Sequence, residues 1–233
     1  MMIGKATDGI DLQMPHDAYS QDKDQPTFKA YLTIIVRNEK GEIIRVHKQW
    51  SHSPTSNFIG LLLPTNWFTN TGNTWTITNT GGTTYTHVII NGVNNNALYY
   101  PSNISNYPTW LVMIQVGSGQ QSNPYSAYKL AAPIANGMGT GQLLYGQPSV
   151  SQTPTVSGSS VYFIVSQAFN NQSGGTVTIT ELGIIIDIYM WNISTKTAQN
   201  FGYFLMWYDV LSSPISVPNG GSIVIYYTFT VNP

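Results

Sequence analysis

The chain has 233 residues, of which 42% are hydrophobic and only 8% charged; its formal net charge is −1 and it contains no cysteine. The hydrophobic content is enough for a packed core. The net charge excludes a basic nucleic-acid-binding surface. The lack of cysteine excludes a disulfide scaffold, a cysteine nucleophile and cysteine-ligated metal centres. Of the nine basic and ten acidic side chains, seven of each precede residue 49. The rest of the chain must present an uncharged surface, whose contacts we expect to depend little on salt or acidity.

Residues 1–26 are polar and lack periodicity, so they are expected to form an extended N-terminal arm or a disordered tail in front of a single domain at 27–233. They contain no apolar core of a signal peptide, and no run in the chain approaches 18 apolar residues. We therefore expect a protein made in the cytoplasm, without a membrane-spanning segment.

Residues 31–50 have the clearest hairpin pattern in the chain. Two runs rich in β-branched residues flank the turn Asn38-Glu39-Lys40-Gly41. Gly41 can adopt the left-handed conformation that closes a type I turn with a bulge.

One short helix is predicted at residues 54–63, where the alternation typical of strands is lost. Ser53 is a suitable N-cap, Pro54 fits the first helical turn, and Pro64 ends the pattern. Little other helix is expected.

The remainder is expected to be all-β, because turn clusters rich in Asn, Gly and Thr separate short alternating runs. The strand candidates are residues 74–78, 83–91, 109–116, 160–169, 175–191, 201–211 and 222–231. Since strands do not alternate with helices, the pattern favours an antiparallel β-sandwich of jelly-roll type, with an immunoglobulin-like sandwich as the second choice.

A long loop is predicted at residues 117–159, which are rich in Gly, Ser, Gln and Pro. Loops of this length in compact domains are usually functional or ordered by a neighbour. Because the segment contains the apolar stretches YKLAAPI and LLY, we expect it to contact a neighbouring subunit.

Two carboxylates, Glu181 and Asp187, interrupt the apolar strand at residues 175–191. Their even spacing places both on one face of a strand, about 20 Å apart, whereas paired glycosidase carboxylates lie about 5–10 Å apart. We therefore predict no catalytic site and no enzyme. A glycan hydrolase would need two of Glu181, Asp187 and Asp209 to lie within about 10 Å of each other.

Neither a metal site nor a cofactor is expected. The spacing of the four histidines, His16, His47, His52 and His87, is not typical of metal ligands. The stretch GMGTGQ at residues 137–142 follows no clear strand and lacks the lysine of a phosphate-binding loop.

Two sets of residues are candidates for surface contacts. The first is the aromatic set Tyr99, Tyr100, Tyr107 and Trp110. These side chains would stack on glycans or lie in an interface, although aromatic residues also commonly fill strands and pin loops. The second set is the N-glycosylation sequons at Asn103, Asn171 and Asn192, which matter only in a host that glycosylates such proteins.

The last third of the chain carries several short motifs in order. They are Thr180-Glu181-Leu182-Gly183, Asp209-Val210-Leu211, Pro214-Ile215-Ser216-Val217-Pro218 and Gly220-Gly221-Ser222. Together with the hairpin and the Ser53–Leu62 segment, which contains Asn57 and Phe58, these motifs resemble structural β-sandwich proteins of archaeal viruses and some tailed phages.

The resemblance implies a capsid, tail, nozzle or turret protein rather than an enzyme. It also implies that Glu181 and Asp209 are structural anchors. Asp209 would cap a loop at residues 212–214 through backbone amides, and Glu181 would fix the register of the adjacent strand or meet a neighbouring subunit. Asp187 has no role in this interpretation.

The predicted function is that of a virion structural protein. It would form homo-oligomers and contact other virion proteins through strand edges, long loops and the N-terminal arm, without direct nucleic-acid binding. The alternative is a carbohydrate-binding or host-attachment module whose exposed Tyr and Trp side chains stack on host surface glycans.

Overall fold

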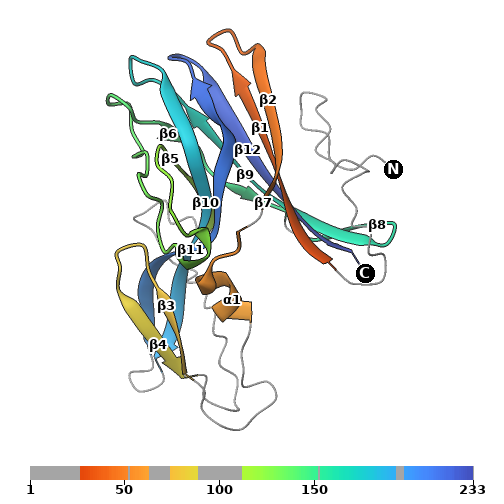
Figure 1. Cartoon of the computed structure of the whole chain (residues 1–233), viewed down its shortest axis with the longest axis vertical. Helices are drawn as coiled ribbons and strands as arrows, with labels where there is room; N and C mark the ends of the chain where they lie inside the picture. The colour runs from red at the N-terminus through yellow and green to blue at the C-terminus, as the bar shows by residue number, and fades with distance from the viewer. Residues whose placement is uncertain are drawn as a thin grey trace. The chain divides into compact units, whose positions relative to one another are not determined.

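The structure is a computed structural model that describes residues 27–51, 53–62, 74–88, 112–151, 153–192 and 197–232. Of these described residues, 61% lie in strands, which form several antiparallel sheets, and one short segment is α-helical (Figure 1). The predicted all-β, sandwich-like fold is confirmed.

The chain divides into two compact units, where we expected one domain over residues 27–233. The first unit comprises residues 1–52, 134–179 and 211–233, and the second comprises residues 53–133 and 180–210. Each unit is built from segments that are far apart in the sequence.

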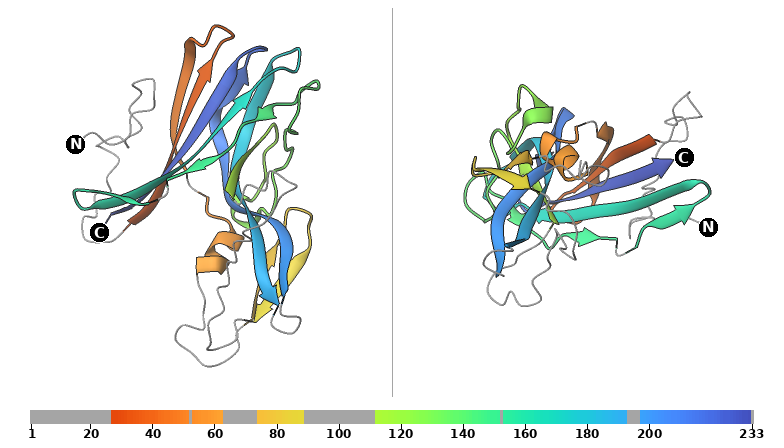
Figure 2. Two further views of the ribbon diagram at one scale, coloured as in Figure 1. Left: turned by 180° about the vertical axis from the view of Figure 1, so that it is seen from behind. Right: turned by 90° about the horizontal axis from the view of Figure 1, so that it is seen from below.

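The first unit contains a seven-stranded antiparallel sheet in the order β2-β1-β12-β9-β6, with β7 and β8 also paired to β9. Its strands are β1 (Thr27–Arg37), β2 (Ile43–Ser51), β6 (Leu144–Tyr145), β7 (Ser149–Val150), β8 (Thr155–Ser157), β9 (Ser160–Asn170) and β12 (Ser222–Asn232). Figures 1 and 2 show β1 and β12 side by side, and their register runs from Thr27 opposite Asn232 to Arg37 opposite Ser222. The first and last strands of the sheet are therefore neighbours.

The turn of the β1–β2 hairpin lies where the sequence predicts it. Gly41 has a φ of 81°, and its amide donates to the carbonyl of Asn38 (3.0 Å). The side-chain oxygen of Asn38 accepts from the amides of Lys40 and Glu42, both at 3.0 Å. Its amide group donates to the Glu42 carboxylate (2.7 Å). The charged turn is thus organised by one asparagine.

One face of the sheet, which we call the inner face, carries apolar side chains along the length of β1. Leu32 lies opposite Tyr227, and both are fully buried. Further along, the ring of Phe229 is stacked between Phe28 (centroids 5.9 Å apart) and Phe163 (4.8 Å). Apolar residues at alternating positions of β1, β12 and β9 therefore form a continuous apolar surface across these three strands.

Side chains of β2 hold the end of β11 (Thr197–Val217) within the first unit. Arg45 donates to the carbonyl of Pro214 (2.8 Å) and to the hydroxyl of Ser213 (2.6 Å). Gln49 accepts from the amide of Ser212 (2.9 Å). The expected loop at residues 212–214 is wrong, because these residues continue the strand.

The second unit contains a three-stranded sheet in the order β11-β10-β5 and the two-stranded sheet β3-β4. Its elements are α1 (Ser56–Leu62), β3 (Thr74–Thr78), β4 (Thr84–Val88), β5 (Val112–Gly117), β10 (Val177–Asn192) and the larger part of β11. Strand β10 begins in the first unit, and strand β11 ends in it. These two strands therefore belong to both units.

The helix starts at Ser56 and not at Pro54 as predicted. The reason is that residues 53–55 are extended and pair with β11. The amide of Tyr208 donates to the carbonyl of Ser53, and the amide of Thr55 donates to the carbonyl of Met206, both at 3.0 Å. Ser53 is therefore a strand-pairing residue and not an N-cap.

The predicted loop at residues 117–159 is interrupted by short regular elements, and its contact with a neighbouring subunit stays a prediction. It contains β6, β7, β8 and the short 3-10 helix η3 (Pro124–Ser126). Leu130 and Leu143 are fully buried. Of the apolar residues that suggested contact with a neighbouring subunit, Leu130, Ile134 and Leu143 are buried in their own chain, whereas Tyr128, Ala131 and Ala132 are exposed.

Gly183 permits the close approach of β10 and β11, and its replacement by alanine should be destabilising. A Cβ at this position would lie 2.5 Å from both Leu205 Cδ1 and the Trp207 carbonyl oxygen. We expect Gly183→Ala to lower the free energy of unfolding by about 1–3 kcal/mol, as overpacked cores do. Chemical denaturation measures the effect. Gly175→Ala is the control, because nothing lies within 4 Å of its Cβ position, and an equal loss in both variants would contradict the prediction.

Candidate functional site

Glu181 is a fully buried carboxylate in the first half of β10. It lies directly opposite Gly117 at the end of β5. A Cβ on Gly117 would lie 2.5 Å from Glu181 Oε1, so the glycine leaves the space in which the carboxylate sits over the neighbouring strand. The site thus depends on a pair of residues, one from each strand.

Four hydrogen bonds satisfy the two carboxylate oxygens. Oε1 accepts from the amides of Ala132 (2.7 Å) and Gly119 (3.2 Å). Oε2 accepts from the amide of Ala131 (3.0 Å) and from the hydroxyl of Tyr208 (2.8 Å). All four donors are neutral, and hydrogen bonds from backbone amides to a carboxylate are stronger than those between neutral groups.

The three amides belong to the two ends of one loop, residues 118–133, which we call the Glu181 loop. Its ends are also joined by a hydrogen bond from the Ser118 amide to the Ala132 carbonyl (2.9 Å). The hydroxyl of Thr180, the residue before Glu181, donates to the carbonyl of Gly119 (2.8 Å). Glu181 therefore closes the loop at its base.

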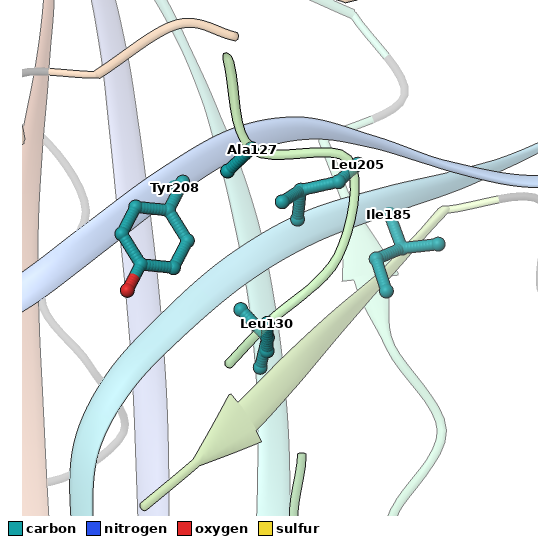
Figure 3. Close-up of a cluster of buried hydrophobic side chains, with 5 residues drawn as sticks. All are labelled: Ala127, Leu130, Ile185, Leu205 and Tyr208. Carbon is teal, nitrogen blue, oxygen red and sulfur yellow. The ribbon is translucent and has the colours of Figure 1, made fainter. Parts of the chain in front are cut away.

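Apolar packing holds the middle of the same loop against the sheet. Ala127 and Leu130 from the loop gather with Ile185, Leu205 and Tyr208 in one buried cluster (Figure 3). Burial of a leucine side chain such as that of Leu130 stabilises a fold by about 1.5–3 kcal/mol. The loop is thus attached by polar contacts at its ends and by apolar contacts between them.

Tyr208 links the carboxylate to a third point of the loop. Its hydroxyl donates to Glu181 and accepts from the amide of Gln121 (2.7 Å). Burial raises the pKa of the Tyr208 phenol well above its ordinary value; the Gln121 amide lowers it somewhat, and the charges of Glu181 and Asp209 raise it further. The phenol therefore stays protonated and remains a donor at neutral pH.

This geometry is suited to holding backbone and not to proton transfer. A general base needs an oxygen within reach of a substrate proton, whereas Glu181 is fully buried and its oxygens serve four donors. Asp187 lies on the same face of β10 as Glu181, about 20 Å away along the strand, and Asp187 and Asp209 are buried as well. The spacing of Glu181 and Asp187 does not fit the paired carboxylates of a glycosidase.

Asp209 lies in β11, next to Tyr208. The hydrogen bonds described above for residues 212–214 come from Arg45 and Gln49. An anchoring role of Asp209 stays a prediction.

Asn171 is not available as a glycosylation site. Its side chain is fully buried, and its amide group donates to the carbonyls of Gly175 and Val217, both at 2.8 Å. Its oxygen accepts from the amide (3.0 Å) and hydroxyl (2.7 Å) of Ser173. The predicted site at Asn171 is therefore wrong, because the Asn and Ser of the sequon form a buried turn.

The other predicted surface residues lie mainly outside the part of the chain that the structure describes. These are Tyr99, Tyr100, Tyr107, Trp110 and Asn103. Asn192 is the last residue of β10. Instead, the described surface shows three exposed tyrosines that the sequence analysis did not single out: Tyr125 and Tyr128 of the Glu181 loop, and Tyr203 of β11.

Within the described ranges, no three His, Asp or Glu side chains come together as metal ligands. His47 Nε2 lies 2.9 Å from Gln49 Oε1 instead. Among the same residues, no helix is long and apolar enough to cross a membrane. Comparisons with family models, curated proteins and solved structures find no match.

Removing the charge of Glu181 should open the base of the loop. In Glu181→Gln, an NH2 group replaces one acceptor oxygen and faces an amide donor, so buried donors lose their partners. We expect a loss of about 3 kcal/mol in the free energy of unfolding, and faster amide exchange at Gly119, Ala131 and Ala132. Glu42→Gln, at an exposed carboxylate, is the control. Unchanged exchange at these three amides would contradict the assignment.

The phenol of Tyr208 should make the fold sensitive to alkali. An unfolded tyrosine ionises near pH 10, whereas burial raises the pKa of folded Tyr208 above that value. Between the two pKa values, only the unfolded state loses its proton, so the free energy of unfolding falls as the pH rises. The stability difference between the natural chain and Tyr208→Phe should therefore be constant below about pH 10 and shrink above it.

Chemical denaturation between about pH 8 and 11 tests this. Tyr125→Phe removes an exposed phenol from the same loop and is the control. A difference that grows with pH would have the wrong sign for a raised pKa.

Proposed function

We propose that the protein is a virion structural protein, a repeated subunit of a capsid, tail, nozzle or turret. The observation that carries this proposal is the exposure of apolar side chains on the strands of the first unit. On the edge strand β2, Ile43, Ile44 and Val46 are 42–52% exposed. Exposed apolar residues gathered on an edge strand favour pairing with another chain.

The low charge of the chain beyond residue 48 supports assembly through the surfaces of that part. Beyond residue 48 the sequence has only five charged side chains, and three of them, Glu181, Asp187 and Asp209, are buried. Apart from those of Lys129 and Lys196, contacts of this part of the chain are therefore apolar or made by neutral hydrogen bonds. Repeated contacts of this kind hold symmetric assemblies together without ion pairs.

Host attachment through glycans is a second candidate function, favoured by the Glu181 loop. Tyr125 is 59% exposed and Tyr128 is 36% exposed. Lys129 Nζ lies 5.7 Å from the centroid of the Tyr128 ring. Rigid tyrosines present a large contact area at a small entropic cost. An attachment module on a virion subunit would combine the two functions.

The mass of the purified protein tests the proposal. We expect multi-angle light scattering to show assemblies of defined size, at multiples of 25.7 kDa. Because the contacts are largely uncharged, that mass should be unchanged between about 0.05 and 1 M salt. A monomer at all concentrations would contradict the proposal, and glycan-array binding that is lost in Tyr125→Ala would then favour host attachment.

A further inference from the structure

Four apolar side chains form a continuous exposed row across one end of the seven-stranded sheet. Phe28 on β1 lies opposite Val231 on β12, Val231 lies opposite Val161 on β9, and Val161 lies opposite Val156 on β8. Their exposed fractions are 44%, 44%, 39% and 72%. Residues directly opposite each other in antiparallel strands point to the same face, so we call this set the apolar row.

The apolar row is the uncovered end of the inner face. Phe28 stacks on Phe229, which is buried, and Phe229 stacks on Phe163. The row therefore continues the core of the first unit. In Figure 1 the ends of β1, β8 and β12 lie together beside the C-terminus.

The row alone is too small for a stable contact between two rigid copies. A stable interface buries about 800 Å² on each partner, and four partly exposed side chains offer far less. An occupant must add surface of its own. The N-terminal arm, residues 1–26, is such a segment, and it joins the sheet next to Phe28.

One stretch of the arm matches the row in chemistry. Although the arm as a whole lacks periodicity, residues 10–14 read Ile10-Asp11-Leu12-Gln13-Met14. In an extended chain, the three apolar side chains would share one face and the two polar side chains the other. The following Pro15 favours an extended conformation at Met14.

The dimensions match as well. Side chains two residues apart in a strand are about 6.6 Å apart, so residues 10, 12 and 14 span about 13 Å. Four adjacent strands span three spacings of about 4.8 Å, or about 14 Å. We propose that residues 10–14 of one copy lie across the strands of a second copy, with Ile10, Leu12 and Met14 on the apolar row. This inference deepens the proposed function and rests on it.

The place of the arm in the sequence favours exchange between copies. The arm directly precedes Thr27, the first residue of β1, and Phe28 of the apolar row follows it. The residues between Met14 and Phe28 can span up to about 45 Å when extended, which is enough to reach a neighbour. Two copies that exchange arms form a symmetric pair in which each row is covered once.

A matched pair of substitutions tests the role of the row in the full-length protein. Val156→Lys puts a charge on the row, whereas Thr155→Lys puts the same charge on the other face of β8. We expect Val156→Lys to raise the concentration for half-maximal assembly at least about tenfold. Thr155→Lys should leave it unchanged. Equal behaviour of the two variants would overturn the inference.

Cross-linking tests the occupant, because the natural chain has no cysteine that would interfere. Leu12→Cys and Val161→Cys are prepared as separate proteins, mixed and oxidised. We expect a covalent dimer from this mixture, and none when Thr155→Cys replaces Val161→Cys. No dimer from the first mixture would overturn the exchange of arms, as would a cross-link formed only within a single chain carrying both cysteines.

Light scattering distinguishes failure of this inference from failure of the proposed function. If the natural protein forms defined assemblies but shows no cross-link between Leu12→Cys and Val161→Cys, the arm exchange is wrong and the subunit function stands. If the natural protein is monomeric at every concentration, both are wrong.

Discussion

The hydrogen bonds between the Glu181 carboxylate and the Glu181 loop are the constraint on which the second unit depends. A buried carboxylate costs several kcal/mol in desolvation unless donors surround it. Here three backbone amides and one phenol do so. No neutral side chain could accept from all four groups, which explains why a chain with so little charge retains an acid in an apolar strand. The same constraint explains the glycine at position 117, because a side chain there would displace the carboxylate.

Local patterns in the sequence predict much of the fold and little of this site. Alternation and turn residues identify the β1–β2 hairpin and the all-β class, because these depend on neighbours in the sequence. Glu181 meets the amide of Gly119 across 62 positions of sequence, and no local pattern encodes that contact. The start of α1 was missed for the same reason, since β11 draws residues 53–55 into an extended conformation.

Asn171 shows how one local pattern can serve two different purposes. An Asn followed two residues later by Ser is a glycosylation sequon when it is exposed, and a hydrogen-bonded turn when it is buried. Only the tertiary environment decides between them, and here Asn171 donates to Val217, which is 46 residues away. The exposed apolar row also cannot be predicted from local sequence patterns. Its four residues come from four strands and are brought together only by the fold.

The pairing of β1 with β12 affects how the protein is made. About 185 residues separate the end of β1 from the start of β12. On the ribosome, one edge of β1 stays without its native partner until β12 has been synthesised. The first unit cannot be completed before then, since it includes residues 211–233, whereas the second unit ends at residue 210. Until β12 pairs with it, the β1–β2 hairpin keeps a strand edge open to contact with other chains.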